Sequence, residues 1–390
     1  MPSIKRLTII ALAASAFAGS AAAQELAPVD QPPAAKGWKT ETVAEDLPQP
    51  WGMAWLPDGR ILVTGKEGTL HLVSGKARQA IPIEGLPQLF TGGQGGLLDI
   101  VLHPADMSNP QANPRVYLTM ASGSGSENRT LLVQGIFDGK RVHGLRTLFS
   151  VTPGKSGGQH FGSRLAWMKD GTLLMSIGDG GNPPQRVGSM LAREQAQNLG
   201  SHHGSILRLT AEGKAAPGNP LAGKQGALPE IWSYGHRNVQ GLAVDPVSGR
   251  VWASEHGPRG GDEINLVEGG KNYGWPLQSY GLDYKTREPV GMKVVPGMVQ
   301  PLVVWTPSPA PSGLVVYTGK AFPQWQGSLF SGSLAGQDIR RVALDAQGKI
   351  LKQEKLDIGK RVRDVRQGPD GHLYALTDEA KGKLLRIVPQ

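Results

Sequence analysis

The sequence predicts an all-β fold, a six-bladed β-propeller made of four-stranded antiparallel blades. Its 390 residues include 54 glycines and 30 prolines, and both residue types are costly inside helices. A unit made of a turn and two short β-rich runs also recurs at intervals of roughly 40 to 80 residues, which is typical of a propeller. A large β-sandwich is the alternative, but it would not need one repeated motif.

Each copy of the repeated unit begins with a turn signal, such as the Asp58-Gly59 pair ahead of the β-rich run 61–64. An Asp-Gly pair between β-forming residues is a strong hairpin signal. One such blade is too small to bury a core, so neighbouring blades must stack, and their loops meet at the mouth of a central tunnel. The six copies begin at Pro57, His103, Lys169, Asp245, Gly327 and Pro369.

The N-terminus has the three parts of a secretory signal. Lys5 and Arg6 precede an apolar run over 7–17, and an A-x-A end leads to Ala23. The run is well short of the ~20 residues that span a bilayer, and no later stretch is apolar enough to insert stably. We therefore expect cleavage after Ala23 and a periplasmic or secreted protein. The predicted parts are a signal peptide over 1–23, a flexible lead-in over 24–38 and the propeller domain over 39–390.

Charge and cysteine content exclude several classes of function. The formal net charge is +9, but no run of Lys and Arg exceeds a few residues, so we expect a basic surface and no nucleic-acid partner. The absence of cysteine excludes disulfides, thiolate metal sites and cysteine nucleophiles. Residues 154–158 match the G-x-S-x-G elbow of hydrolases, but the strand and helix that this motif requires are missing.

Four polar residues stand in three glycine-containing segments where a ligand could approach the backbone closely. Gln94 lies in GGQGG, His160 in GGQHFG, and Arg237 with Asn238 in YGHRNVQG. An imidazole titrates near neutrality and suits proton transfer. On these residues alone, a structural and a catalytic role for His160 both remain open.

Two further segments have the chemistry of ion and anion binding. The loop 255–263 combines carboxylates with backbone carbonyls, and such oxygen ligands suit Ca²⁺. Arg361 and Arg363 alternate at strand period, so both guanidiniums point to one face. Planar guanidiniums pair well with the carboxylates of a small ligand, although a solvated sheet edge would also explain the pattern.

Six motifs together resemble the soluble pyrroloquinoline quinone (PQQ)-dependent sugar dehydrogenases, most closely the aldose sugar dehydrogenase branch. The resemblance runs from about residue 51 to residue 387, with the motifs in the family's order. It implies a six-bladed propeller that holds PQQ and Ca²⁺ at the tunnel mouth. The motifs are GGQGGLLDIVLHP, GGQHFGSRL, WSYGHRNVQGLAVDP, EHGPRGGDEIN, KNYGWP and KRVRDVRQGPDG.

The resemblance also implies roles for individual residues. His160 would be the general base that takes the proton of the anomeric hydroxyl while hydride passes from C1 to PQQ. Arg237 would polarise the quinone oxygen and stabilise the charge that develops there. The residues implied to bind the cofactor are Gln94, Arg237, Asn238, Ser333, Arg361 and Arg363.

For calcium, the resemblance implies two positions. The carbonyls of Gly257 and Pro258 would hold an ion against PQQ, while Glu263 and the Tyr273 carbonyl would form a second, structural site. One residue departs from the family pattern, because Ala335 stands where the family has a lysine. This departure removes one cation that would bind PQQ.

The resemblance therefore implies a quinoprotein that oxidises aldose sugars at C1 to lactones. A calcium-dependent propeller lactonase and a non-catalytic binding propeller are the alternatives. The lactonase would need several carboxylate and amide ligands at the tunnel centre, and only the loop 255–263 is acidic enough. The extended loops of a dimer interface look short, so we expect a monomer.

Overall fold

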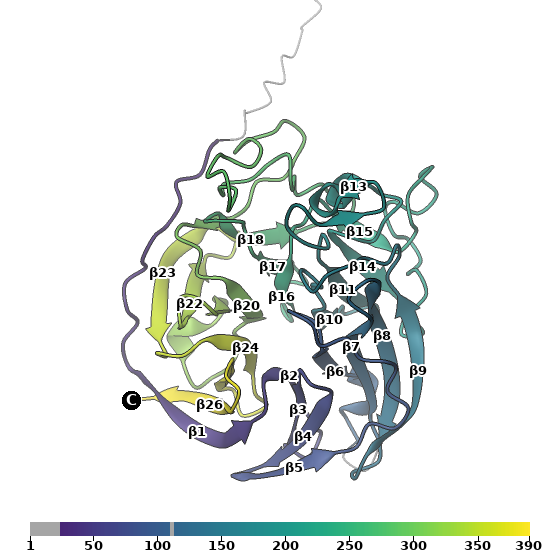
Figure 1. The fold of residues 1–390 in the computed structure, drawn as a ribbon. Helices are drawn as coiled ribbons and strands as arrows, with labels where there is room; N and C mark the ends of the chain where they lie inside the picture. The colour runs from purple at the N-terminus through teal and green to yellow at the C-terminus, as the bar shows by residue number, and fades with distance from the viewer. Residues whose placement is uncertain (1–23, 110–112) are drawn as a thin grey trace, which may run out of the picture.

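The computed structural model describes residues 24–109 and 113–390, so the predicted signal peptide over 1–23 lies outside the described residues. Six antiparallel four-stranded sheets form a ring (Figure 1), which confirms the predicted fold class. One more sheet is the two-stranded pair β12 (Arg186–Val187) and β13 (Met190–Leu191). No helix among the described residues is long and apolar enough to cross a membrane.

We number the blades from the first complete sheet along the chain. Blade 1 is β2 (Pro50–Trp55), β3 (Ile61–Gly65), β4 (Thr69–Ser74) and β5 (Ala77–Ile81), and blade 2 is β6 (Leu97–Leu102), β7 (Arg115–Gly123), β8 (Asn128–Phe137) and β9 (Val142–Ser150). Blade 3 is β10 (Leu165–Trp167), β11 (Leu173–Ile177), β14 (Ser205–Leu209) and β15 (Ile231–Tyr234), and blade 4 is β16 (Val239–Val244), β17 (Val251–Glu255), β18 (Asp262–Val267) and β19 (Val303–Trp305). Blade 5 is β20 (Pro311–Val316), β21 (Leu329–Ser333), β22 (Asp338–Leu344) and β23 (Ile350–Asp357), and blade 6 is β24 (Val362–Gln367), β25 (Leu373–Thr377), β26 (Gly382–Pro389) and β1 (Trp38–Leu47). The 3₁₀ helices are η1 (Pro104–Asp106), η2 (Ala192–Gln197) and η3 (Pro323–Trp325).

Each of the six predicted turn signals lies between the first and second strand of one blade. Residues 57–60 separate β2 from β3, for example, and residues 169–171 separate β10 from β11. The first strands face the tunnel and contact one another around the ring, as β2 does with β6 and β20 with β24. The repeat found in the sequence therefore marks the end of each tunnel-facing strand.

The ring is closed by pairing the two ends of the propeller domain. β1 forms the outermost strand of blade 6 and pairs antiparallel with β26, so that Trp38 faces Pro389 and Thr42 faces Leu385. Figure 1 shows the purple N-terminal strand beside the yellow C-terminal one. The first strand of the domain thus completes the last blade.

The segment before β1 lies against the outer strands of blades 4 and 5. The amide of Val29 donates to the Val304 carbonyl at 2.8 Å, and the amide of Ala35 donates to the Lys355 carbonyl at 2.8 Å. In Figure 1 this segment passes beside β23 before it enters β1. Residues 24–38, which we predicted as a flexible lead-in, therefore make backbone hydrogen bonds to two blades.

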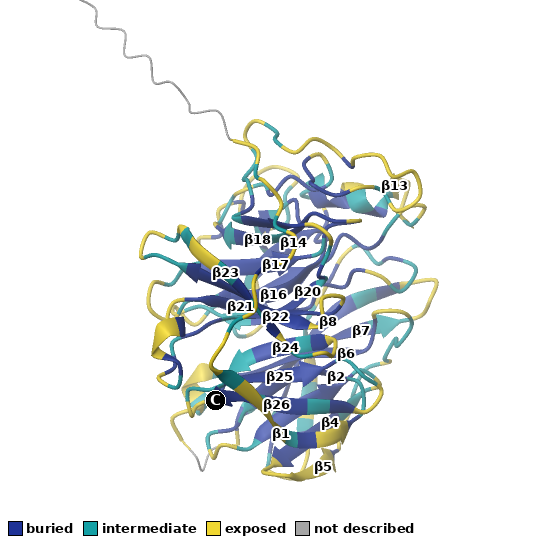
Figure 2. Cartoon of the chain, turned by 90° about the vertical axis from the view of Figure 1, so that its left-hand side faces the viewer, coloured by how far each residue is buried: buried dark blue, intermediate teal, exposed yellow. Residues whose placement is uncertain are grey.

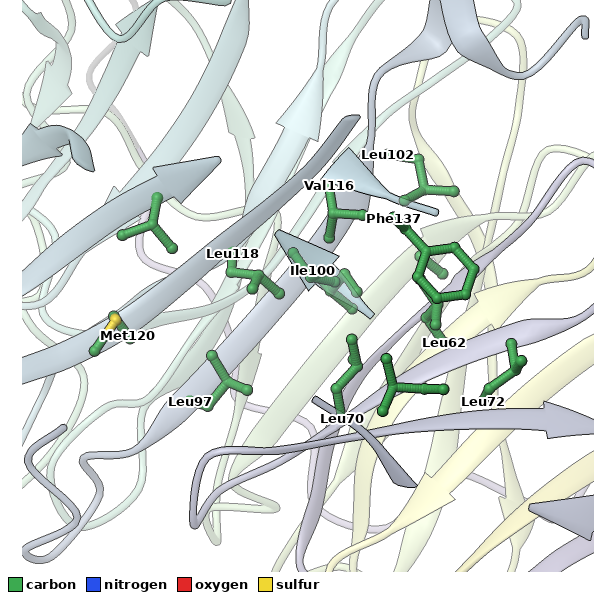
Figure 3. Packing of buried hydrophobic residues seen from close by; sticks show 14 of the residues in the cluster. Leu62, Leu70, Leu72, Leu97, Ile100, Leu102, Val116, Leu118, Met120 and Phe137 are labelled. Atoms are coloured by element: carbon green, nitrogen blue, oxygen red, sulfur yellow. The ribbon is translucent and has the colours of Figure 1, made fainter. Parts of the chain in front are cut away.

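The core consists of apolar layers between adjacent blades. Leu62 and Leu70 of blade 1 pack with Ile100 and Leu118 of blade 2, and all four side chains are excluded from solvent (Figure 3). Figure 2 shows buried residues along the inner strands and exposed ones along the outer strand β5. Each blade thus depends on its neighbours for burial, as a propeller requires.

Four charged residues, three of them buried and one (Arg366) partly buried, join the blades at the tunnel centre, and we call them the tunnel charge cluster. Arg164, ahead of β10, lies 2.9 Å from Asp364 of β24 and 3.3 Å from Asp99 of β6. Arg366 of β24 pairs with both carboxylates. The Arg164 guanidinium also donates to the Gln240 carbonyl at 2.6 Å. The cluster is neutral overall and connects blades 2, 3, 4 and 6.

Replacing Arg164 by Met should lower the free energy of unfolding by about 3–5 kcal/mol, because it leaves buried carboxylates without full compensation. Denaturant unfolding of the purified protein measures this change. Arg60→Met is the matched control, since it breaks the exposed pair with Asp58 and should cost about 0–1 kcal/mol. Equal stability losses in the two variants would contradict a central role for the cluster.

Candidate functional site

A cavity of about 490 Å³ lies where the tunnel-facing strands begin, and we call it the central cavity. Ligand pockets commonly have volumes of about 300–1,000 Å³. Every blade contributes to its wall, because all six inner strands start at this end of the tunnel. The wall residues include Trp51, Lys66, Gln94, Phe161, Gly162, Gln240, His256, Leu334, Arg361, Arg363 and Asp378.

His160 lies in the loop that also supplies Phe161 and Gly162 to the cavity wall. Its backbone has φ of 51°, and its amide donates to the Gln94 side-chain oxygen at 2.8 Å. The side chain is buried, and its Nδ1 lies 2.6 Å from Asp179 Oδ1. Asp179 also accepts from the Trp275 indole at 2.7 Å and from the Gly181 amide at 2.9 Å. The imidazole is therefore held in one orientation by a fully bonded carboxylate.

The local charges favour a neutral imidazole beside an ionised carboxylate. Burial lowers the pKa of His160, Asp179 opposes this shift, and the charge of Arg237 adds to it. Burial acts to raise the pKa of Asp179, but the interactions with His160, the charge of Arg237 and the hydrogen bond from the Gly181 amide together lower it. We assign the Nδ1 proton to the bond with Asp179, which leaves Nε2 as a hydrogen-bond acceptor.

Lys155 is a buried cation beneath the same loop. Its Nζ donates to the Gly157 carbonyl at 3.2 Å and lies 3.8 Å from the centre of the Phe161 ring. Burial lowers the pKa of Lys155 to about 7, and the charge of Asp179 partly opposes that shift. The lysine thus contacts both the glycine part and the aromatic part of this loop.

Arg237 and Asn238 are buried at the start of β16, next to His160. One guanidinium nitrogen of Arg237 donates to the His256 carbonyl at 3.0 Å, and another donates to Asn182 Oδ1 at 2.8 Å. The amide nitrogen of Asn182 lies 3.5 Å from His160 Nε2. The Asn182 side chain therefore lies between the two predicted catalytic residues.

Three of the predicted cofactor-binding residues have buried polar atoms without a partner among the described residues. They are Arg237 Nε, Asn238 Nδ2 and Ser333 Oγ. An unpaired buried donor costs about 1–3 kcal/mol, so such groups are common where a ligand completes the hydrogen bonding. This pattern fits a small molecule with several oxygen acceptors.

The predicted arginine pair faces one carboxylate that sequence reasoning did not single out. Arg361 donates to Asp378 Oδ2 at 2.8 and 2.9 Å, and Arg363 donates to Asp378 Oδ1 at 3.2 and 3.3 Å. The convergence of both guanidiniums follows from their strand-period spacing. Arg361, Arg363 and Gln94 all line the central cavity.

Three of the four predicted calcium-binding residues line a second, very small cavity of about 10 Å³, namely Gly257, Glu263 and Tyr273. Pro258 lies instead beside a different cavity, and its carbonyl accepts a hydrogen bond from Tyr284 at 2.6 Å. A space of this size suits a single ion or water. The described residues contain no group of three or more His, Cys, Asp or Glu that could hold a metal.

Glu263 is close to a second carboxylate. The Asn265 amide donates to Glu255 at 3.0 Å and to Glu263 at 3.2 Å, so it bridges the two side chains. Burial, followed by the charge of Glu255, raises the pKa of Glu263 well above its ordinary value. The Tyr273 hydroxyl is already bonded to the Leu266 carbonyl and the Glu268 amide. A cation bound here would offset the repulsion between the carboxylates.

Sequence reasoning missed Asp179, Asn182 and Asp378. Each of them stands in a polar loop that follows the end of a strand, β11 for the first two and β25 for the third. An acidic residue in the loop IGDGG was the only available signal for Asp179. Nothing in the spacing relates Asp378 to Arg361, because they come from different strands.

Comparison with known proteins identifies the family. A sequence profile described as Glucose / Sorbosone dehydrogenase matches residues 47–386, so the chain belongs to that family and is a sugar dehydrogenase, as we predicted. It is 49% identical over 358 residues to an uncharacterized protein of Synechocystis sp., covering 90% of this chain and 86% of that protein. It is 40% identical over 360 residues to the aldose sugar dehydrogenase YliI of Escherichia coli, covering 90% of this chain and 92% of that protein. The structure of the PQQ-bound aldose sugar dehydrogenase of Streptomyces coelicolor superposes with a TM-score of 0.70 at 29% identity, covering 91% of this chain and 99% of that one.

The protonation state of His160 can be measured by NMR of ¹⁵N-labelled histidine. We expect a neutral ring protonated on Nδ1 at pH values above about 6.5, the ordinary pKa of histidine. Asp179→Asn should lower the His160 pKa further, because the carboxylate charge favours the imidazolium, and should remove the preference for this tautomer. The signals of His143, on the outer strand β9 of blade 2, should not change. A wild-type ring protonated on Nε2 would contradict the assignment.

Proposed function

We propose that this protein is an exported, calcium-binding quinoprotein that oxidises aldose sugars at C1 to lactones, with PQQ as cofactor. The observation that carries the proposal is the buried His160–Asp179 pair beside a cavity whose wall carries Arg361 and Arg363. Family membership supports sugar oxidation, and the PQQ-bound relative from Streptomyces coelicolor supports the choice of cofactor. These comparisons favour a dehydrogenase over a lactonase or a non-catalytic propeller.

The central cavity has the chemistry to hold PQQ, a planar molecule with three carboxylates and two quinone oxygens. Arg361 and Arg363 offer planar donors for carboxylates. Arg237, Asn238 and Ser333 are not among the wall residues of the central cavity, but their orphaned donors would gain acceptors from a cofactor that reached behind the wall. Gln94 already fixes the His160 amide through its side-chain oxygen, and its amide nitrogen is available to a ligand.

The chain's own residues would move the proton and stabilise charge. When bound, PQQ supplies the hydride acceptor. His160 Nε2 would take the proton of the anomeric hydroxyl, because Asp179 holds the Nδ1 proton and stabilises the imidazolium that forms. Arg237 would stabilise developing negative charge from a buried, preorganised position. A sugar hydroxyl that reaches His160 Nε2 must take the place of the Asn182 amide.

Calcium would bind through oxygen atoms only. Glu263 and the Tyr273 carbonyl would form one site, and the carbonyls of Gly257 and Pro258 would hold an ion beside the cofactor. Such ligands suit a hard cation. The predicted signal peptide over 1–23 would direct export.

The proposal is tested by mixing the mature protein with Ca²⁺, PQQ and glucose and following the reduction of an artificial dye. His160→Ala should lower kcat by about 10²- to 10⁴-fold through loss of the general base, while PQQ affinity changes little. His143→Ala, on the outer strand β9, should retain wild-type turnover. Dye reduction that survives in His160→Ala at the wild-type rate would exclude His160 as the base.

Calcium binding is tested by thermal unfolding with and without Ca²⁺. At a concentration of about 100 times Kd, a ligand stabilises the folded state by ~2.7 kcal/mol, which raises Tm measurably. Glu263→Gln should abolish most of this rise, and without calcium it should be at least as stable as the wild type because the repulsion with Glu255 is relieved. Glu268→Gln, an exposed neighbour, should respond to calcium like the wild type. An unchanged calcium response in Glu263→Gln would contradict the assigned ligand.

A further inference from the structure

Lys66 is a cation on the wall of the central cavity to which neither the sequence motifs nor the resemblance gave a role. It directly follows β3, and its backbone is fixed on both sides. Its amide donates to the Gln49 carbonyl at 3.0 Å, and its carbonyl accepts from the Leu97 amide at 2.9 Å. Its Nζ donates to the Gly93 carbonyl at 2.6 Å. The side chain therefore spans from blade 1 to the glycine loop that carries Gln94.

The glycine loop is shaped to accept this lysine. Gly96 has φ of +143°, and a Cβ at this position would lie 2.5 Å from Lys66 Cγ and 2.3 Å from the Lys66 carbonyl oxygen. A side chain at position 96 would collide with the aliphatic part of Lys66, so only glycine fits here. The apolar part of Lys66 thus packs on the loop while the ammonium group stays at the cavity.

The charges on the cavity wall leave Lys66 without a carboxylate partner. Arg361 and Arg363 share Asp378, and Glu379 pairs with Lys360. No carboxylate of the described residues lies within ion-pair distance of Lys66. An ammonium group has three donors, of which one is used by the Gly93 carbonyl.

We propose that Lys66 is a binding residue for the cofactor and pairs with one carboxylate of PQQ. This inference rests on the proposed function. Asp378 already neutralises part of the positive charge of Arg361 and Arg363. A ligand with three carboxylates that enters the cavity therefore needs a further cation. Lys66 supplies this cation from blade 1. It thereby offsets the missing lysine at position 335, where Ala335 follows the wall residue Leu334 on blade 5.

The test measures PQQ binding to the apoprotein by calorimetry, independently of turnover. Lys66→Gln keeps a hydrogen-bond donor but removes the charge, and we expect its Kd for PQQ to rise about 10- to 100-fold, the range for a hydrogen bond to a charged group. The dependence of Kd on salt concentration should also weaken. Lys66→Arg should stay within a few-fold of the wild type. Lys76→Gln, at the exposed turn between β4 and β5, is the matched control.

The outcomes separate this inference from the proposed function. If the wild type binds PQQ and Lys66→Gln binds it as tightly as Lys76→Gln does, the inference is wrong and the proposed function stands. If the wild type binds no PQQ, both are wrong. If Lys66→Gln fails to fold, Ala335→Lys in the chain with wild-type Lys66 decides. Because Lys66 already supplies the cation, the added lysine should change the Kd for PQQ by no more than a few-fold, and a gain of 10-fold or more would overturn the inference.

Discussion

The neutral cluster of Arg164, Asp99, Asp364 and Arg366 at the tunnel centre is the constraint on which the rest of the structure depends. Apolar layers hold adjacent blades together, but they have little directionality. The ion pairs join residues of β6 and β24 through Arg164, and they fix how the tunnel-facing strands meet. Because every inner strand begins at the central cavity, this arrangement also fixes the cavity wall. Arg164 stacks on the Trp51 ring at 4.2 Å and so joins the cluster to that wall.

Next to this cluster, the candidate site holds ionisable groups in two different environments, one on the cavity wall and one buried behind it. The cavity wall presents cations, partly balanced by Asp378, and is suited to an anionic ligand. The His160–Asp179 pair behind the wall is buried, and this burial lowers the pKa of the imidazole. A base must be deprotonated before it can accept a proton, and the nearby charge of Arg237 helps to keep it so. Under the proposed function, anion binding and proton abstraction would therefore take place at adjacent positions.

The sequence predicted the parts of this structure that local chemistry determines. Turn signals such as Asp58-Gly59 marked one hairpin per blade, and the spacing of Arg361 and Arg363 placed both on one face. It did not reveal the pairing of β1 with β26, since β1 has no partner nearby in sequence. Asp179 and Asp378 were missed for the same reason, because their partners are defined only after the chain folds. The packing of the Lys66 side chain against the glycine loop likewise depends on Gly96, which belongs to another blade.

The central claim is that His160 and the cavity together oxidise a sugar with a quinone cofactor. An anaerobic single-turnover experiment tests it most directly, with the PQQ-loaded protein mixed with glucose or with glucose deuterated at C1 and no electron acceptor present. The account predicts that one equivalent of sugar reduces the cofactor, as seen in its absorbance, and that deuterium slows this step. A bound cofactor whose spectrum stays unchanged with glucose and with every other aldose tried would contradict the account.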